Sequence, residues 1–215
     1  MLGFVEEIVL LQLDEHGKLV ELPLSAADVV LAGAALMELA LRSKVDTDLN
    51  RFFVVDREPT GDEILDDALS ALVSDGNEAT TSAAIELIAL NAGRYRDVAL
   101  KRLVEKGVLR EEEGRFLWVF HTRRYPVIDD TEQREVRTRL RQLILTDEIP
   151  DPRDVVLLCL IDACGLLGLV LSLDEIAARR ERIEQLARLD LIGQAMTKAV
   201  GEIRFIIQYA SAPIH

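Results

Sequence analysis

Two arginines, Arg94 and Arg96, are the residues of this chain best suited to hold an anion. If Asp97 caps the helix that follows, both guanidinium groups lie at its N-terminus, where free backbone N–H groups and the helix dipole favour a phosphate. Each guanidinium could then bind the phosphate through two parallel hydrogen bonds. If the helix begins earlier, Arg96 falls on the same side as Leu100 and Leu103 and requires a carboxylate partner instead. Both alternatives remain open at the level of sequence.

An apolar hairpin is predicted shortly after these arginines. Its strands are residues 108–110 and 116–120, on either side of the segment EEEG. In the second strand Phe116 and Trp118 would share one face and Leu117 would lie on the other, so both faces are apolar. One face can pack on the core. The second needs a partner subunit or the interfacial layer of a membrane, unless neighbouring helices bury it.

Other polar residues form no catalytic or metal-binding pattern. The three histidines are scattered, and none has a second ligand three or four positions away. The acidic pairs Glu6-Glu7 and Asp66-Asp67 point in different directions on a helix, so we interpret them as solvated or capping groups. Phosphate-loop and nucleophile motifs are missing from the sequence. We therefore predict that the protein is not an enzyme and has no catalytic residues, metal or cofactor.

The charge of the chain is unevenly distributed. Its net charge is −13, which opposes general nucleic-acid binding. Residues 91–145 nevertheless contain 13 Lys and Arg against 9 Asp and Glu, a net charge of +4 that leaves −17 for the remainder. An acidic body with one basic segment can orient on a polyanionic surface. The same charges can also be an ordinary solvated helix face.

Local signals mark most of the elements that must position these residues. Ser25 with Asp28, and Thr60 with Glu63, are spaced as capping boxes. Gly107 is expected just after the end of the basic helix. The predicted helices and strands, in chain order, are 4–13 (an apolar element), 18–22 (extended), 25–42 (helix), 52–55 (strand), a helix beginning at 60–63, then helices 82–90, 97–106, 131–145, one beginning after Asp151-Pro152, 174–189 and 191–209.

The longest apolar run, Val155–Leu171, is interpreted as a buried central helix. It is about the minimum length that spans a bilayer, and Asp162 interrupts it, so no transmembrane segment is predicted. Cys159 and Cys164 lie in this run, five positions apart, and are interpreted as small core residues of a protein in a reducing compartment. The predicted fold is mainly α: residues 1–215 form a single globular helical domain around a buried hydrophobic central helix, with one or two small β-hairpins.

Four co-linear segments resemble the Golgi phosphoprotein family in order and spacing: ELALRSKV (Glu38–Val45), PTGDEILDDAL (Pro59–Leu69), LVEKGVL (Leu103–Leu109) and the hairpin. The similarity covers essentially the whole chain, from VEEIVLLQL (Val5–Leu13) to the last helix. The resemblance implies a mostly helical domain whose hairpin serves in oligomer contacts and membrane insertion. It also implies binding of phosphatidylinositol 4-phosphate at a peripheral membrane surface. The family's basic N-terminal tail does not precede the matching core here, and the chain is similar to a bacterial member.

The residues that the resemblance implies for the lipid headgroup are only partly kept. Arg96 matches one arginine of the family, and Arg94 lies beside the position of another, which is Gly93 here. Pro23 and Ala32 replace a tryptophan and an arginine. The resemblance therefore implies an anionic-lipid site whose specificity for the phosphoinositide is reduced.

The function expected from the sequence is a peripheral membrane module that binds an anionic lipid or phosphoinositide headgroup. Arg94 and Arg96 are its predicted headgroup ligands. Phe116, Leu117 and Trp118 are predicted to enter the membrane or to hold a homo-oligomer through the 108–120 hairpin. The expected localisation is cytoplasmic, peripheral on the inner face of the membrane. The alternative is a soluble, self-associating adaptor that binds proteins and does not depend on lipid.

Overall fold

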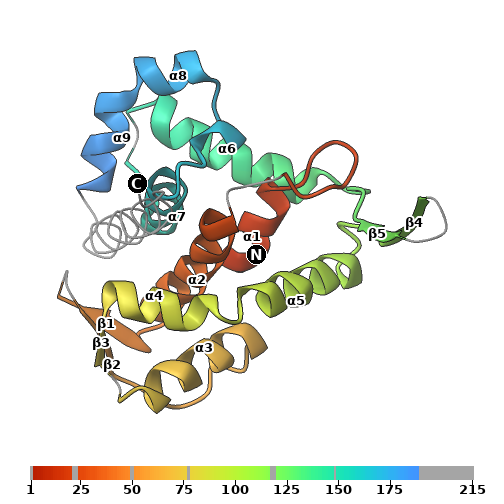
Figure 1. Ribbon diagram of the computed structural model, residues 1–215. Coiled ribbons are helices and arrows are strands. Elements are labelled where there is room, and N and C mark those ends of the chain that lie inside the picture. Colours follow the sequence, from red (N-terminus) through yellow and green to blue (C-terminus); the bar gives the residue numbers. More distant parts are fainter. Residues whose placement is uncertain are drawn as a thin grey trace, which may run out of the picture.

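The computed structural model describes residues 2–20, 24–48, 51–76, 78–116, 120–147 and 149–188. Its helices are α1 (Phe4–Leu11), α2 (Leu24–Leu41), α3 (Glu63–Ser74), α4 (Thr81–Ala89), α5 (Ala92–Glu105), α6 (Thr131–Leu145), α7 (Pro152–Ala163), α8 (Leu173–Ala178) and α9 (Arg180–Ala187) (Figure 1). The strands are β1 (Val45–Thr47), β2 (Arg51–Val54), β3 (Glu78–Thr80), β4 (Glu112–Phe116) and β5 (Phe120–Arg124). The prediction of a mainly helical fold with small hairpins is confirmed.

The core is built on α2, which packs against α1, α3, α4, α5 and α7. Ala32, Ala34 and Ala35 are fully buried, and their small side chains allow neighbouring helices to approach closely. In α7 the eight consecutive residues from Asp154 to Ile161 are buried, as expected for a helix inside the fold. The buried centre is therefore shared between α2 and α7.

The apolar run Val155–Leu171 is not one helix. α7 ends at Ala163, and Gly165 adopts a positive φ of 72°. The N–H of Leu166 then donates to the carbonyl of Ile161 at 2.7 Å, which closes the helix by a Schellman motif. The chain continues as a short 3-10 turn at Leu167–Leu169. A glycine in the left-handed conformation thus ends the helix despite the apolar sequence that follows.

Several helix starts differ from the predicted ones. α2 begins at Leu24, so Ser25 is not its capping residue. α3 is capped by Asp62, whose carboxylate accepts from the N–H groups of Ile64 and Leu65 at 2.9 and 3.3 Å, and Thr60 instead donates to Asp66. By contrast, the predicted start of α7 is confirmed: Asp151 accepts from the N–H of Arg153, and Pro152 is the first helical residue.

The C-terminal part of the chain agrees only in part with the prediction. The expected helix 131–145 is confirmed as α6. The expected helix 174–189 is divided into α8 and α9, because Arg179 leaves helical geometry between them. The last predicted helix, 191–209, lies outside the described residues.

The predicted hairpin exists, but with a different register. β4 pairs with β5 in antiparallel fashion, with Glu112 opposite Arg124, Glu113 opposite Arg123 and Phe116 opposite Phe120. The segment EEEG, which the sequence predicts as the turn, therefore lies largely in β4. Residues 117–119, between the two strands, lie outside the described residues. Opposite charges on facing positions stabilise antiparallel pairs. The pairs Glu112–Arg124 and Glu113–Arg123 thus favour the observed register.

The hairpin stands away from the helices at the C-terminal end of α5, while the antiparallel sheet β1-β2-β3 lies at the other end of the molecule (Figure 1). The described hairpin strands contact each other far more than any helix. The base is held to the body: the Tyr125 N–H donates to the Gly17 carbonyl at 2.8 Å, and the Arg110 N–H to the Pro126 carbonyl at 3.0 Å. The base of the hairpin is therefore fixed, and its described strands project from the helical body.

Candidate functional site

The helix that carries the predicted anion ligands begins five residues earlier than Asp97. α5 starts at Ala92, after Asn91 at the N-cap position. Arg94 and Arg96 therefore lie within the first two turns of the helix and not ahead of its N-terminus. The structure therefore has the second of the two sequence alternatives, an earlier helix start, and the two arginine side chains leave the helix in different directions.

Arg94 is directed toward α3, where its guanidinium is already engaged. It donates to Asp67 at 2.6 Å and to Glu63 at 2.9 Å. Asp67 also accepts from the side chains of Asn91 and Tyr95. The hydrogen bonds from Glu63 and Asp67 raise the pKa of Arg94 above its ordinary value. A ligand at this place would have to displace two carboxylates.

Arg96 is directed toward α2 and is held more loosely. Its Nη2 lies 3.6 Å from Oδ1 of Asp28, an ion pair beyond hydrogen-bond distance. The Arg96 side chain is 29% exposed and that of Asp28 is 45% exposed. The carboxylate partner that one sequence alternative required is therefore present. Since exposed pairs of this kind contribute only about 0–1 kcal/mol, an incoming anion can replace Asp28 at little cost.

The neighbouring positions add no cation to this site. Ala32, where the resemblance implies an arginine, is fully buried in α2. Pro23 lies outside the described residues. Within the described part, Arg96 is thus the predicted headgroup ligand that a lipid could reach without breaking a hydrogen-bonded network.

The hairpin combines charged strands with an apolar end. Arg123 and Arg124 of β5 are exposed, and Arg123 lies 3.4 Å from Glu111. Phe116 is the last residue of β4. Leu117 and Trp118 lie outside the described residues. That these three residues enter a membrane or an oligomer contact stays a prediction.

The sequence predicts that the acidic pair Glu6-Glu7 consists of solvated or capping groups. In the structure the pair is not solvated. Both residues are buried in α1. Glu6 accepts from the N–H of Gly3, which agrees with a capping role, and from Lys106 at 2.6 Å. Glu7 lies 2.7 Å from Arg139 and 3.2 Å from Arg153. Sequence reasoning missed this burial because the three cations come from the residue after α5, from α6 and from α7, about 100 or more positions away.

A pocket of about 570 Å³ also escaped prediction. It lies where the start of α1, the end of α2, the turn before α3 and the end of α5 meet. Its lining residues are Leu2, Gly3, Glu6, Glu38, Leu41, Arg42, Gly61, Asp62, Arg102, Lys106 and Arg153. They come from separate parts of the chain, so spacing along the sequence contains no signal for them.

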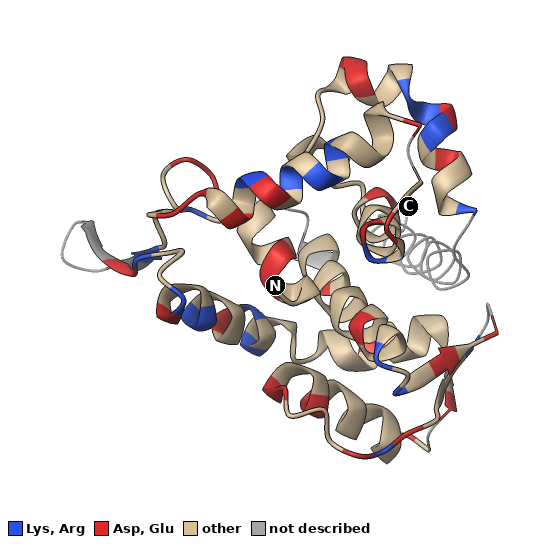
Figure 2. Cartoon of the chain, turned by 180° about the vertical axis from the view of Figure 1, so that it is seen from behind, with Lys and Arg blue, Asp and Glu red and all other residues tan. Residues whose placement is uncertain are grey.

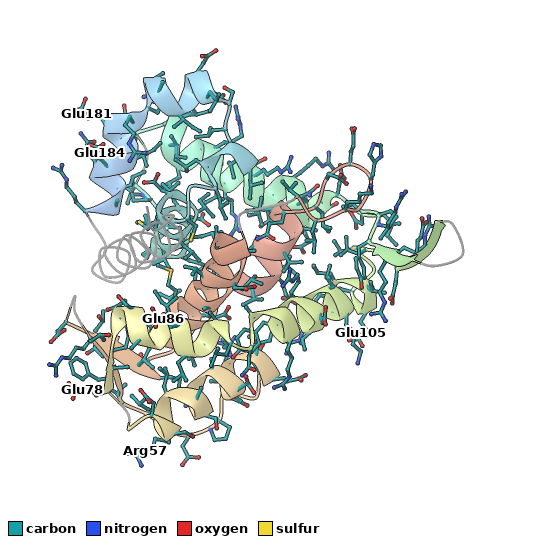
Figure 3. All side chains as sticks on the ribbon, viewed as in Figure 1. Arg57, Glu78, Glu86, Glu105, Glu181 and Glu184 are labelled. Atoms are coloured by element: carbon teal, nitrogen blue, oxygen red, sulfur yellow. The ribbon has the colours of Figure 1, made fainter. Side chains whose placement is uncertain are left out.

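The distribution of charge follows the helices. Lys and Arg are prominent on α5 and α6, whereas α3 carries Asp and Glu (Figure 2). Acidic side chains such as Glu86, Glu105 and Glu181 lie at the surface of their helices (Figure 3). Among the described residues no group of three His, Cys, Asp or Glu could hold a metal ion. In the same part of the chain, every helix is too short or too polar to cross a membrane.

Comparison with known proteins places this sequence in a family. The model of the family Golgi phosphoprotein 3 (GPP34) matches residues 4–203. The vacuolar protein sorting-associated protein 74 of Eremothecium gossypii is 26% identical, over 80% of this chain and 62% of that relative. The chain therefore spans less than two thirds of the relative's length. Because the family model covers nearly all of the sequence, the protein belongs to the Golgi phosphoprotein 3 family.

Proposed function

We propose that this protein is a peripheral module that docks on anionic membrane surfaces. As a single domain over residues 1–215, it would act from the cytoplasm on the inner face of the membrane, by binding and not by catalysis. The observation that carries the proposal is the hairpin β4–β5, whose described strands stand away from the helical body, together with the apolar sequence FLWVF from the last residue of β4 to the first of β5. Membership of the family supports the same reading.

The hairpin has the composition expected of a membrane-inserting element. Its end contains the chain's one tryptophan, and tryptophan is favoured in the interfacial layer of a bilayer. Arg123 and Arg124 follow on β5 and are exposed. Each basic residue near an anionic surface contributes about 1 kcal/mol of attraction. An apolar end flanked by exposed arginines can therefore insert while its base remains at the headgroups.

Arg96 is the proposed ligand for an anionic headgroup. Its ion pair with Asp28 is loose and partly exposed, so a phosphate or carboxylate of the lipid can take the place of Asp28. Arg94 is a weaker candidate because two carboxylates hold it. With Ala32 buried and neutral, we propose recognition of anionic lipids in general, with phosphatidylinositol 4-phosphate as one member of that class.

Co-sedimentation with vesicles of phosphatidylcholine containing phosphatidylserine or phosphatidylinositol 4-phosphate tests this proposal. At low salt the protein should sediment with both anionic compositions. Arg96→Gln should weaken binding about fivefold, the equivalent of one charge near the surface. Trp118→Ala should weaken it about tenfold through loss of apolar burial. Asp28→Asn should strengthen it, since it removes the carboxylate that competes with the lipid.

Arg180→Gln is the control, because Arg180 is also an ion-paired arginine at the surface, 51% exposed, but lies on α9. This variant should bind vesicles as the wild type does. Failure of the wild-type protein to bind any anionic vesicle at low salt would refute the proposal.

The same hairpin supports a second candidate, self-association without lipid. A two-stranded ribbon that projects from the body offers unpaired strand edges, which pair readily with another copy. Light scattering would then show an oligomer that becomes a monomer when residues 112–124 are replaced by a short glycine-serine linker. A monomeric wild type would exclude this candidate.

A further inference from the structure

The pocket between α1, α2 and α5 is separate from the proposed membrane site, since neither Arg96 nor the hairpin lines it. We propose that it binds the phosphate group of a small molecule. The inference is independent of membrane docking and rests on the balance of hydrogen-bond donors and acceptors in the lining.

The three carboxylates of the lining are already supplied with donors. Asp62 accepts from two backbone N–H groups at the start of α3 and from two nitrogens of Arg102. Glu38 accepts from the N–H of Phe4 at 2.7 Å and from Arg42 at 2.8 Å. Glu6 accepts from the N–H of Gly3 and from Lys106. The acidic side of the pocket therefore has little capacity left for a cation.

The cationic side retains unused donors. A guanidinium has five N–H groups. In the described structure, Arg42 makes one hydrogen bond, through Nη2 to Glu38, and Arg102 makes two, both to Asp62. A ligand that enters this pocket must consequently supply acceptors. Phosphate oxygens match this requirement, because planar guanidinium groups bind them bidentately.

The exposed fractions of the charged side chains also indicate that the pocket receives an anion. Arg42 and Lys106 have side chains that are 41% and 43% exposed, whereas their partners Glu38 and Glu6 are 9% and 5% exposed. In these two pairs solvent therefore meets the cation first and the carboxylate lies beneath it, whereas Arg102 and Asp62 are equally exposed, at 25% and 26%. With Arg102 and Arg153, the lining contains four cations against three carboxylates. The entrance of the pocket is thus positive in an otherwise acidic protein.

The size and walls of the pocket suit a small phosphorylated molecule. Its volume of about 570 Å³ lies within the range of roughly 300–1,000 Å³ that is usual for small-molecule sites. Leu2 and Leu41 supply apolar wall beside the charges. The ligand class is a phosphate monoester, whose phosphate could come from a soluble metabolite or from a lipid headgroup.

Isothermal titration calorimetry with inorganic phosphate and with glycerol 3-phosphate, at low ionic strength, tests the site. Arg42→Gln should weaken binding of both about tenfold or more, which corresponds to the loss of one charge-assisted hydrogen bond. Arg42 is itself 41% exposed, and the buried Glu38 keeps the hydrogen bond from the N–H of Phe4 after the substitution, so the variant should remain folded. Leu41→Trp, at a residue that is 42% exposed, should block the entrance without changing any charge. Arg180→Gln should bind as the wild type does.

Vesicles containing phosphatidic acid, a lipid phosphate monoester, distinguish the two sources. Binding of glycerol 3-phosphate that is sensitive to Arg42→Gln supports a soluble ligand. Binding only to these vesicles, again sensitive to Arg42→Gln, supports a lipid ligand. Sensitivity to Arg96→Gln on phosphatidylserine vesicles reports the membrane site alone. If neither the soluble phosphates nor the phosphatidic acid vesicles bind, or if Arg42→Gln and Leu41→Trp bind as the wild type does, the pocket is not a phosphate site.

Discussion

Glu7→Ala is expected to destabilise the protein by about 3–5 kcal/mol, the usual cost of removing one partner from a buried ion pair. Glu7 is buried in α1 and lies within 3.2 Å of arginines on two other helices, Arg139 and Arg153. After the substitution Arg139 still has Asp154 at 3.3 Å. Arg153, stacked over Phe4 at 3.9 Å, loses the carboxylate with which it pairs.

The expected loss of stability arises because buried arginines would lack their carboxylate partner. It does not require a strong net attraction within the ion pair. Burial raises the pKa of Glu7 above its ordinary value, although Arg153 and Arg139 act in the opposite direction. Desolvation of the carboxylate thus outweighs the attraction of its partners, as is common for buried pairs. The cluster nevertheless connects α1, α6 and α7, so removal of its central anion should weaken all three contacts.

Urea denaturation followed by circular dichroism measures this effect as a lower midpoint with an unchanged slope. Glu78→Ala is the control, because Glu78 also pairs with an arginine, Arg51, but at the surface. Its loss should cost less than about 1 kcal/mol. Equal destabilisation by the two variants would show that the buried cluster has no special role.

Gly17→Ala is expected to cost about 3 kcal/mol and to loosen the base of the hairpin. Gly17 has a φ of 71°, a conformation that is strained for alanine. A Cβ atom at this position would also lie 2.2 Å from the backbone nitrogen of Pro126. Because that neighbour is backbone, it cannot move aside, and overpacking of this kind adds about 1–3 kcal/mol to the strain. The hydrogen bond from Tyr125 to Gly17 should break as the two segments separate.

Two measurements check this result: the denaturation midpoint and the hydrogen-exchange rate of the Tyr125 amide, which should rise. Gly107→Ala separates strain from collision, since Gly107 has a φ of 73° but open space where its Cβ would lie. That control should lose only about 1 kcal/mol. If Gly17→Ala is no worse than Gly107→Ala, the contact with Pro126 does not hold the hairpin base.

Local signals in the sequence were sufficient for much of the fold. The apolar period of 131–145 predicted α6, and Asp151 followed by Pro152 predicted the start of α7. Gly107 was correctly placed after the end of α5, where it has a positive φ. These features depend on neighbours within one helical turn, so they can be recognised without knowledge of the rest of the chain. The candidate headgroup ligands Arg94 and Arg96 were also identified from a local signal, their position beside a predicted helix start.

Errors arose where distant residues decide the local structure. The start of α5 was placed at Asp97, but Tyr95 is buried and its hydroxyl donates to Asp67 of α3, which favours helix from Ala92 onward. The hairpin turn was placed at EEEG, although Glu112 and Glu113 face Arg124 and Arg123 across the ladder. Neither the α3 carboxylate nor the cross-strand register can be read from one segment alone.

By itself the sequence determined the family, the helical class of the fold and the two features of the proposed membrane site, a basic helix and an apolar hairpin. Only the tertiary structure decided how the charges are used. It joined Arg94 to α3, left Arg96 loosely paired with Asp28, buried Glu7 between two arginines and brought Arg42 and Arg102 to one pocket. The physical reason is that charge type is local, whereas the partner, the depth of burial and the remaining hydrogen-bonding capacity depend on which helices pack together.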